Sequence, residues 1–265
     1  MPTDLVRGVP RRFAFRELIF VFVCFMSLHM LPANAKQQDS AIMGDMPGMD
    51  HGAMTMDSGQ ESPEALAQRL GGKHESEFNH HLAGLLVFCA GLFVLLEQPL
   101  ANYWPRARYV WPICFLAAGF FVLLFSDLEI WPLGNQTPWY ALTHSTEILQ
   151  HKLFAAILLS LGYVEIQRAR GRFNGFWTAL FFPVVGIAGA ILLLFHVHGG
   201  DMSAPNAMKT MEHIETQHHW FAAVGVGISI SKGLAEIPQK LQLVFSRIWP
   251  ALLICLGILL IVYTE

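Results

Sequence analysis

A short tract rich in methionine and histidine is the most specific chemical feature of the sequence. Residues 43–56 read MGDMPGMDHGAMTM, in which Gly, Asp and Pro surround five methionines and one histidine. Methionine ordinarily fills hydrophobic cores, but this tract offers no core to fill. Thioether sulfur is a soft ligand that selects Cu(I), and imidazole suits copper and zinc. The tract therefore predicts copper capture, and a low-complexity linker with incidental methionines is the alternative. Its candidate ligands are Met43, Met46, Met49, His51, Met54 and Met56.

A second group of candidate ligands lies at the ends of long apolar blocks. Imidazoles that open or close several helices would reach one depth near a membrane boundary, which suits a metal site between helices. Ordinary polar residues at interfacial helix ends are the alternative. The candidates are His80, His81, His144, Glu147, His151, His196, His198, Glu215, His218 and His219.

Helical spacing predicts which of these side chains share a face. Thr137-Pro138 is a helix start signal. A helix from there places His144, Glu147 and His151 at i, i+3 and i+7, on one face.

The fifth apolar block gives a similar pattern. A helix that starts near Pro205 places polar residues along two neighbouring faces. The second of these faces carries Met211, Glu215 and His218. The first face carries Met208, Glu212, Glu215 and His219, and a solvated face rich in Glu and His is the alternative.

Two histidine pairs remain. Adjacent residues point about 100° apart on a helix, so one of His80 and His81 is expected to face inward and the other the headgroups. His196 and His198 end the fourth block before Gly199-Gly200, a helix stop signal, and His198 is expected to lie beyond the core in a structural role.

The composition places these residues in a membrane protein. Of 265 residues, 54% are hydrophobic and 14% charged, whereas soluble domains carry about 25% charged residues. Net charge is −3 and no basic tract is present, which excludes nucleic acid as a partner. The four cysteines lie inside apolar runs and predict neither disulfides nor a CxxC metal site.

The N-terminus predicts export. Residues 1–35 combine arginines, an apolar core over 18–31 and the triplet Ala33-Asn34-Ala35, so we expect a cleaved signal peptide, with an uncleaved anchor as the alternative. Residues 36–77 are predicted to form a flexible periplasmic segment, and residues 78–265 a six-helix transmembrane domain. The fold class is thus all-α, a polytopic transmembrane helix bundle. The six spans are predicted near 80–98, 108–127, 146–166, 175–198, 218–236 and 247–264.

Charge predicts the orientation of the spans. With residue 36 outside, eight basic residues fall on the inner side and four outside, which fits the positive-inside rule. Lys232 is among the inner eight and is expected to snorkel at a helix end. We therefore expect a multi-pass protein of the bacterial inner membrane, with the N-terminal segment and Glu265 on the periplasmic side.

The export signal, the Met/His tract and the outer histidines together resemble bacterial copper-resistance membrane proteins of the CopD/PcoD type. The segment Met-Asp-His-Gly-Ala-Met, residues 49–54, also looks like the Met-rich segments of periplasmic copper-resistance proteins. The resemblance implies copper binding and copper passage across the inner membrane. This chain has no inward series of Met or His below the outer layer, which argues against a continuous copper path.

Three functions remain open at this point. The first is a non-enzymatic copper-binding protein for uptake, sequestration or resistance, with the lipid bilayer, copper and a periplasmic copper carrier as partners. The second is a membrane redox protein with bis-His haem b, for which the candidate ligands are His81, His151, His196 and His219. The third is a zinc-dependent hydrolase with Glu147 or Glu215 as general base, although no HExxH motif occurs.

Overall fold

The structure is a computed structural model that describes residues 63–196, 207–237 and 240–265, with side chains from residue 70 onward. The predicted signal peptide, the Met/His tract and His198 lie outside these residues. The described chain is all-helical and contains no β-strand. Its elements are α2 (Pro63–Leu100), η1 (Pro105–Tyr109), α3 (Val110–Phe125), α4 (Pro138–His144), α5 (Thr146–Ala169), α6 (Phe176–Leu194), α7 (Ala207–Glu236) and α8 (Gln242–Ile261).

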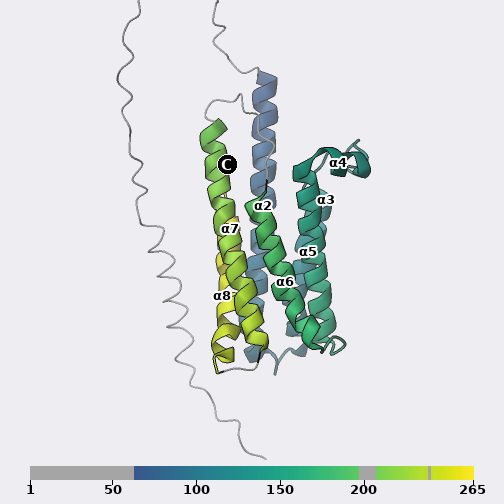
Figure 1. The fold of residues 1–265 in the computed structure, drawn as a ribbon. Coiled ribbons are helices and arrows are strands. Elements are labelled where there is room, and N and C mark those ends of the chain that lie inside the picture. Colours follow the sequence, from purple (N-terminus) through teal and green to yellow (C-terminus); the bar gives the residue numbers. More distant parts are fainter. Residues whose placement is uncertain (1–62, 197–206, 238–239) are drawn as a thin grey trace, which may run out of the picture. The chain divides into compact units, whose positions relative to one another are not determined.

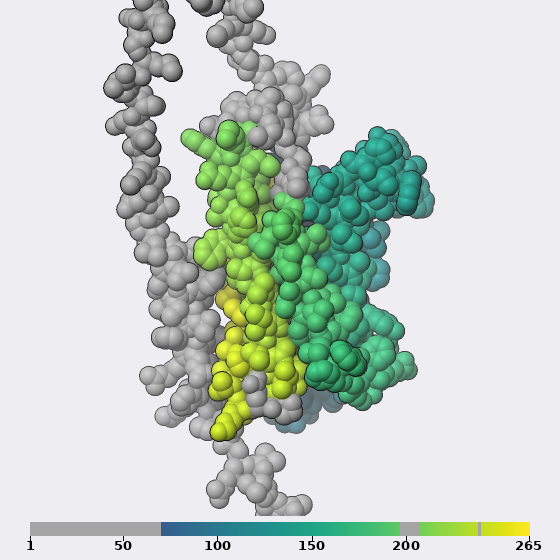
Figure 2. Space-filling view, viewed as in Figure 1, coloured from purple at the N-terminus to yellow at the C-terminus, as the bar shows by residue number. Residues whose placement is uncertain are grey.

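The long helices of the described chain close into a ring (Figure 1). α2 packs against α3 and α8, α5 packs against α3 and α6, and α7 packs against α6 and α8. The space-filling view shows α6 and α7 side by side on one face (Figure 2). The ring order α2–α3–α5–α6–α7–α8 allows residues from six helices to face one central space.

Glycines set the close approach of α2 and α8. A Cβ at Gly257 would lie 2.5 Å from the backbone nitrogen of Phe88, and a Cβ at Gly84 would lie 2.7 Å from the Cβ of Leu260. Small residues that let helix backbones approach closely are typical of helix contacts in membranes. Larger side chains at these two positions would push α2 and α8 apart.

Five helical segments of the described chain are long and apolar enough to cross a membrane. Large apolar side chains such as Phe120 and Val184 also remain exposed on the bundle, as expected where helices contact lipid. The chain is therefore a multi-pass membrane protein. The five segments are Leu70–Leu100, Pro105–Phe125, Thr146–Ala169, Phe176–Leu194 and Gln242–Ile261. α7 is outside this set because polar residues occupy much of its first half.

The helix predicted from Thr137 begins there but ends early. Pro138 occupies the first helical position of α4, and the Thr137 hydroxyl accepts a hydrogen bond from the backbone N–H of Tyr140 at 3.4 Å. Ser145 then adopts an extended backbone (φ −125°, ψ 116°), and its hydroxyl accepts from the N–H of Ile148 at 3.3 Å. Ser145 therefore ends α4 and caps α5.

This break corrects one prediction. His144 is on α4, whereas Glu147 and His151 are on α5, so the predicted single face that carries all three residues is wrong. The sequence has an N-cap residue, Ser145, immediately before Thr146 and Glu147, and this local signal outweighed the longer helical pattern.

Two helix ends also differ from prediction. α2 begins at Pro63, so residues 63–77 are helical although a flexible segment was predicted over 36–77. α6 ends at Leu194, and His196 therefore follows the helix rather than closing it.

Candidate functional site

Four histidine side chains from different parts of the ring lie next to one another. The ring centroids of His151 on α5 and His196, just after α6, are 5.2 Å apart. Those of His196 and His218 on α7 are 5.1 Å apart, and those of His218 and His80 on α2 are 5.8 Å apart. We call these four residues the histidine row.

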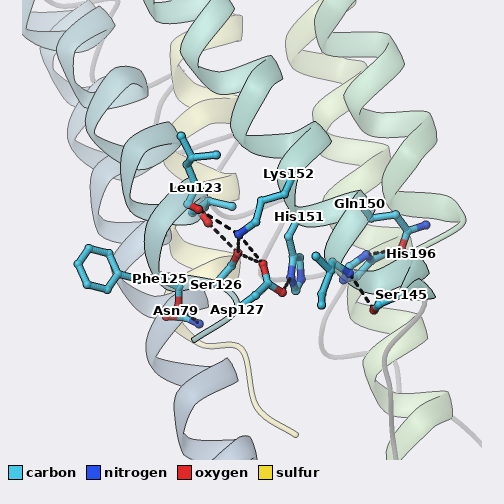
Figure 3. Close-up of polar contacts among 12 residues, drawn as sticks. Asn79, Leu123, Phe125, Ser126, Asp127, Ser145, Gln150, His151, Lys152 and His196 are labelled. Atoms are coloured by element: carbon cyan, nitrogen blue, oxygen red, sulfur yellow. Dashed lines mark hydrogen bonds and ion pairs between the residues drawn. The ribbon is translucent and has the colours of Figure 1, made fainter. Parts of the chain in front are cut away.

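An acidic residue fixes the first imidazole of the row. The Nδ1 atom of His151 lies 2.8 Å from Oδ1 of Asp127, and Nζ of Lys152 lies 2.7 Å from Oδ2 (Figure 3). Ser126 also donates its hydroxyl to this carboxylate. A carboxylate only accepts hydrogen bonds, so Nδ1 of His151 is the donor, and whenever the ring is neutral its lone pair is on Nε2.

The partners of Asp127 keep it ionised although it is buried. Burial raises the pKa of this carboxyl group, but the hydrogen bond and charge of His151, together with hydrogen bonds from Lys152 and Ser126, outweigh burial and hold the pKa below its ordinary value of 3.8. Asp127 is therefore a carboxylate at neutral pH and accepts from both cationic and neutral donors around it.

A glutamine fixes the second imidazole. The side-chain amide nitrogen of Gln150 donates to the carbonyl oxygen of Phe195 at 2.6 Å, which points its Oε1 atom toward His196. Oε1 lies 2.9 Å from Nδ1 of His196 (Figure 3). Because an amide oxygen only accepts, Nδ1 of His196 is again the donor.

The other two imidazoles are fixed by backbone carbonyls of their own helices. Nδ1 of His218 lies 2.8 Å from the carbonyl oxygen of Ile214, and Nδ1 of His80 lies 2.9 Å from that of Ser76. Every imidazole of the row therefore donates Nδ1–H to an oxygen and carries its lone pair on Nε2. Metal-binding histidines are typically held in this way, with one ring nitrogen donating to an oxygen and the other bound to the metal.

Tyr263 supports the end of the row. Its side chain is fully buried, its ring stacks on His80 with centroids 3.9 Å apart, and it meets the edge of His218 at 5.9 Å. Its hydroxyl donates to Oε1 of Glu265 at 2.9 Å. Burial is the main cause that raises the pKa of this phenol, so it stays protonated.

The row lines one end of a cavity of about 440 Å³ inside the helix ring. Glu75, Asp127, Glu129 and Glu147 make this end acidic as well as rich in imidazole. A cationic ligand at this end would therefore meet both carboxylates and nitrogen ligands.

The row does not form a multidentate metal cage. Within residues 63–196, 207–237 and 240–265, no group of three or more His, Cys, Asp or Glu side chains is arranged so that it could hold one metal ion. The geometry instead presents neighbouring imidazoles in pairs.

The remaining predicted residues lie apart from the row. His81 contacts the carbonyl oxygen of Tyr263 through Nε2 at 3.0 Å. His144 is exposed on α4 and stacks on Tyr140 with ring centroids 4.1 Å apart. Glu215 and His219 are exposed on α7.

Of the adjacent histidines, His80 and His218 belong to the row, whereas His81 and His219 do not. On α7, Met208, Glu212, Glu215 and His219 are all exposed, so this face is the solvated alternative and does not turn toward the row. The buried face carries Ile214, His218 and Phe221, since α7 turns this apolar stripe toward the ring.

Two important residues were not among the predicted ligands. Asp127 and Tyr263 each follow the end of an apolar helix. The sequence did offer one signal for Asp127, because it is an ionisable residue that follows an apolar helix at the same end of the bundle as His151. Tyr263 carried no such signal.

A second polar cluster lies at the other end of the ring. The guanidinium of Arg168 on α5 contacts Glu236 on α7 at 2.6 and 3.0 Å and Glu165 at 2.9 Å. Lys232 also pairs with Glu236, and its ammonium lies 4.8 Å from the ring centroid of Trp249. Lys232 is only 7% exposed, so the prediction that it snorkels to the surface is wrong. Its partners on α7 and α8 hold it inside.

Four aromatic rings separate the cavity from this cluster. Phe115 and Phe182 line the cavity, and their ring centroids are 5.8 Å apart. Trp111 contacts both, at 6.0 and 6.4 Å, and Trp249 lies 6.0 Å from Phe182. We call these four residues the aromatic barrier.

No protein-family model matches the chain, and no curated protein or solved structure shows significant similarity to it.

Proposed function

We propose that this protein binds copper at the periplasmic face of a bacterial inner membrane and holds or delivers it there, as part of copper resistance. The observation that carries the proposal is the histidine row, in which each of His80, His151, His196 and His218 donates Nδ1–H to an oxygen. That tautomer presents Nε2 as the ligand atom.

The arrangement in pairs favours Cu(I) over zinc. Structural zinc sites use four protein ligands and catalytic zinc sites use three, and the described residues offer no group of three. Cu(I) accepts lower coordination numbers, and imidazole suits it. Neighbouring pairs along the row would give sites of similar affinity, between which the ion can exchange.

The close spacing favours copper over haem. Bis-His haem needs two imidazoles on opposite sides of a porphyrin plane. Neighbouring rings of the row are tilted by 46° and 38° at centroid distances of 5.2 and 5.1 Å. His81 and His219, two of the four candidate haem ligands, lie outside the row.

The Met/His tract supplies the capture step in this proposal. Met43, Met46, Met49, His51, Met54 and Met56 would take Cu(I) from the periplasm or from a periplasmic copper carrier and pass it to the row. Thioether ligands bind Cu(I) without a preformed cage, so transfer to imidazole requires no large rearrangement.

The proposal includes six membrane spans after a signal peptide, with α7 as the sixth span. α7 packs against α6 and α8, and its second half, residues 219–236, is mainly apolar. In this topology the row lies at the periplasmic end and the Arg168 cluster at the cytoplasmic end, which agrees with the basic residues of the inner loops.

The interior of the helix ring favours a protein that holds or delivers copper over one that conducts copper across the membrane. The aromatic barrier lies between the cavity and the opposite end, and the ammonium of Lys232 lies over Trp249 directly behind it. A fixed positive charge in a narrow apolar passage opposes the entry of cations.

Elemental analysis and an optical spectrum of the detergent-purified protein test this function. Copper at stoichiometric amounts without a Soret band is the expected result. A Soret band would favour the haem alternative, and stoichiometric zinc without copper would favour the hydrolase; either result would overturn the proposal.

A further inference from the structure

The cavity inside the helix ring has the size and lining of a small-molecule site. Its volume of about 440 Å³ falls within the range of roughly 300–1,000 Å³ that ligand pockets occupy. Below the histidine row its lining includes Ala118, Ile157, Gly189 and Leu253. The described residues that line this lower part include no charged side chain, and the hydroxyl of Ser229 is bonded to Gly225 of its own helix at 2.8 Å.

Such a space is unfavourable when empty. The cost of an apolar cavity grows with its volume because the lining atoms lose packing contacts. Water finds few hydrogen-bond partners on this lining, since the hydroxyl of Ser229 is bonded to its own helix, whereas an apolar molecule buries apolar surface there. The lower part of the cavity therefore favours an apolar chain or ring as its occupant.

The histidine row determines which head group the occupant can carry at its other end. Asp127 commits Nδ1 of His151 as a donor, so Nε2 of the neutral ring is an acceptor. Glu75, Asp127, Glu129 and Glu147 line the same end and are unfavourable for an anionic head. A head group that donates a hydrogen bond, such as a hydroxyl, meets both conditions, whereas a carboxylate meets neither.

We propose that the cavity binds a hydroxyl-headed amphiphile such as a quinol, with its hydroxyl at His151 and its apolar chain between α3, α5, α6 and α8. The aromatic faces of Phe115 and Phe182 close the far end of the site. This site does not depend on copper, and its occupant can be measured in metal-free protein.

The test is equilibrium binding to the full-length protein, stripped of metal with EDTA and reconstituted in nanodiscs. The probes are decylubiquinol, 1-dodecanol and dodecanoate. Saturable binding of decylubiquinol with one site per chain and weaker binding of dodecanoate is the expected result. Equal or tighter binding of dodecanoate, or the absence of saturable quinol binding, would overturn the proposal. Binding of 1-dodecanol as tight as that of the quinol would support the hydroxyl-headed class without selecting quinols.

Matched variants on α6 distinguish binding of the probe in the cavity from its partitioning into the nanodisc lipid. Gly189 lines the cavity, and a Cβ there would meet only Ile157, at 3.6 Å, an ordinary contact. Its neighbour Ala188 is exposed. Gly189→Leu is expected to weaken quinol binding at least about tenfold because its side chain displaces ligand methylenes, and Ala188→Leu to leave it unchanged. Equal binding by the two variants would refute the site.

A third variant tests the head group and does not fill the cavity. His151→Phe keeps a ring of similar size and removes the acceptor nitrogen. It is expected to weaken decylubiquinol binding and to leave dodecanoate binding unchanged. Parallel loss of both probes, or unchanged quinol binding, would refute the assigned acceptor.

Discussion

Removing the carboxylate of Asp127 should weaken copper binding without removing any metal ligand. Asp127 accepts the Nδ1–H of His151 at 2.8 Å and thereby keeps the lone pair on Nε2. In Asp127→Ala the imidazole can rotate and change tautomer. Loss of an oxygen that orients a metal-binding histidine typically costs about 10- to 100-fold in metal affinity, which corresponds to about 1.4–2.8 kcal/mol.

Lys152 provides the matched control. It contacts the other oxygen of the same carboxylate at 2.7 Å, and also Leu123 O at 3.0 Å and Ser126 Oγ at 3.3 Å. Lys152→Met breaks the ion pair and leaves Asp127 in place to accept from His151. Each variant loses charged hydrogen bonds, which contribute about 1.5–3 kcal/mol to stability, so both are expected to melt at lower temperature.

The assay is a competition titration with a chromophoric Cu(I) chelator on detergent-purified protein, with thermal unfolding measured in parallel. Asp127→Ala is expected to lose copper affinity, and Lys152→Met to stay within about threefold of wild type because His151 keeps its acceptor. Equal affinity losses in the two variants would show that copper binding follows the stability of the bundle, and the reasoning about His151 would be wrong.

Three further predictions test other parts of the protein. His196→Ala should interrupt the histidine row and lower copper stoichiometry in elemental analysis, whereas His144→Ala, on the exposed face of α4, should not change it. Deletion of residues 43–56 should slow copper uptake from dilute solution and leave the melting temperature unchanged; unchanged uptake would refute the capture role of the tract. Glu236→Gln leaves the partly buried cations Arg168 and Lys232 facing each other, so denaturant unfolding should show a loss of about 3 kcal/mol with no change in copper affinity.

The all-helical fold could be predicted because its signals are long and local. Apolar blocks without strand alternation leave the helix as the only form that pairs every backbone group in lipid. The break at Ser145 does not follow from spacing, because the i, i+3, i+7 pattern of His144, Glu147 and His151 is compatible with one continuous helix. The N-cap at Ser145 had equal local support, and only the observed extended backbone decides between them.

The membership of the row depends on how the helices are rotated, which sequence spacing leaves open. His80 and His81 differ by about 100° around α2, and the packing of α2 against α8 and Tyr263 turns His80 inward. On α7 two amphipathic faces were plausible from spacing, and the one with Ile214 and Phe221 is buried because it carries more apolar surface. Asp127 could not be assigned as the partner of His151 without knowing that α3 packs on α5.

X-ray absorption at the copper K-edge, on Cu(I)-loaded protein that lacks residues 43–56, tests the central claim most directly. Without the methionine tract, copper held by the histidine row should show a first shell of imidazole nitrogens at low coordination number. It should lose this shell in the double variant His196→Ala/His218→Ala, which leaves no neighbouring pair in the row. Failure to retain copper, or a first shell made only of sulfur, would contradict the claim that the histidine row is the copper site.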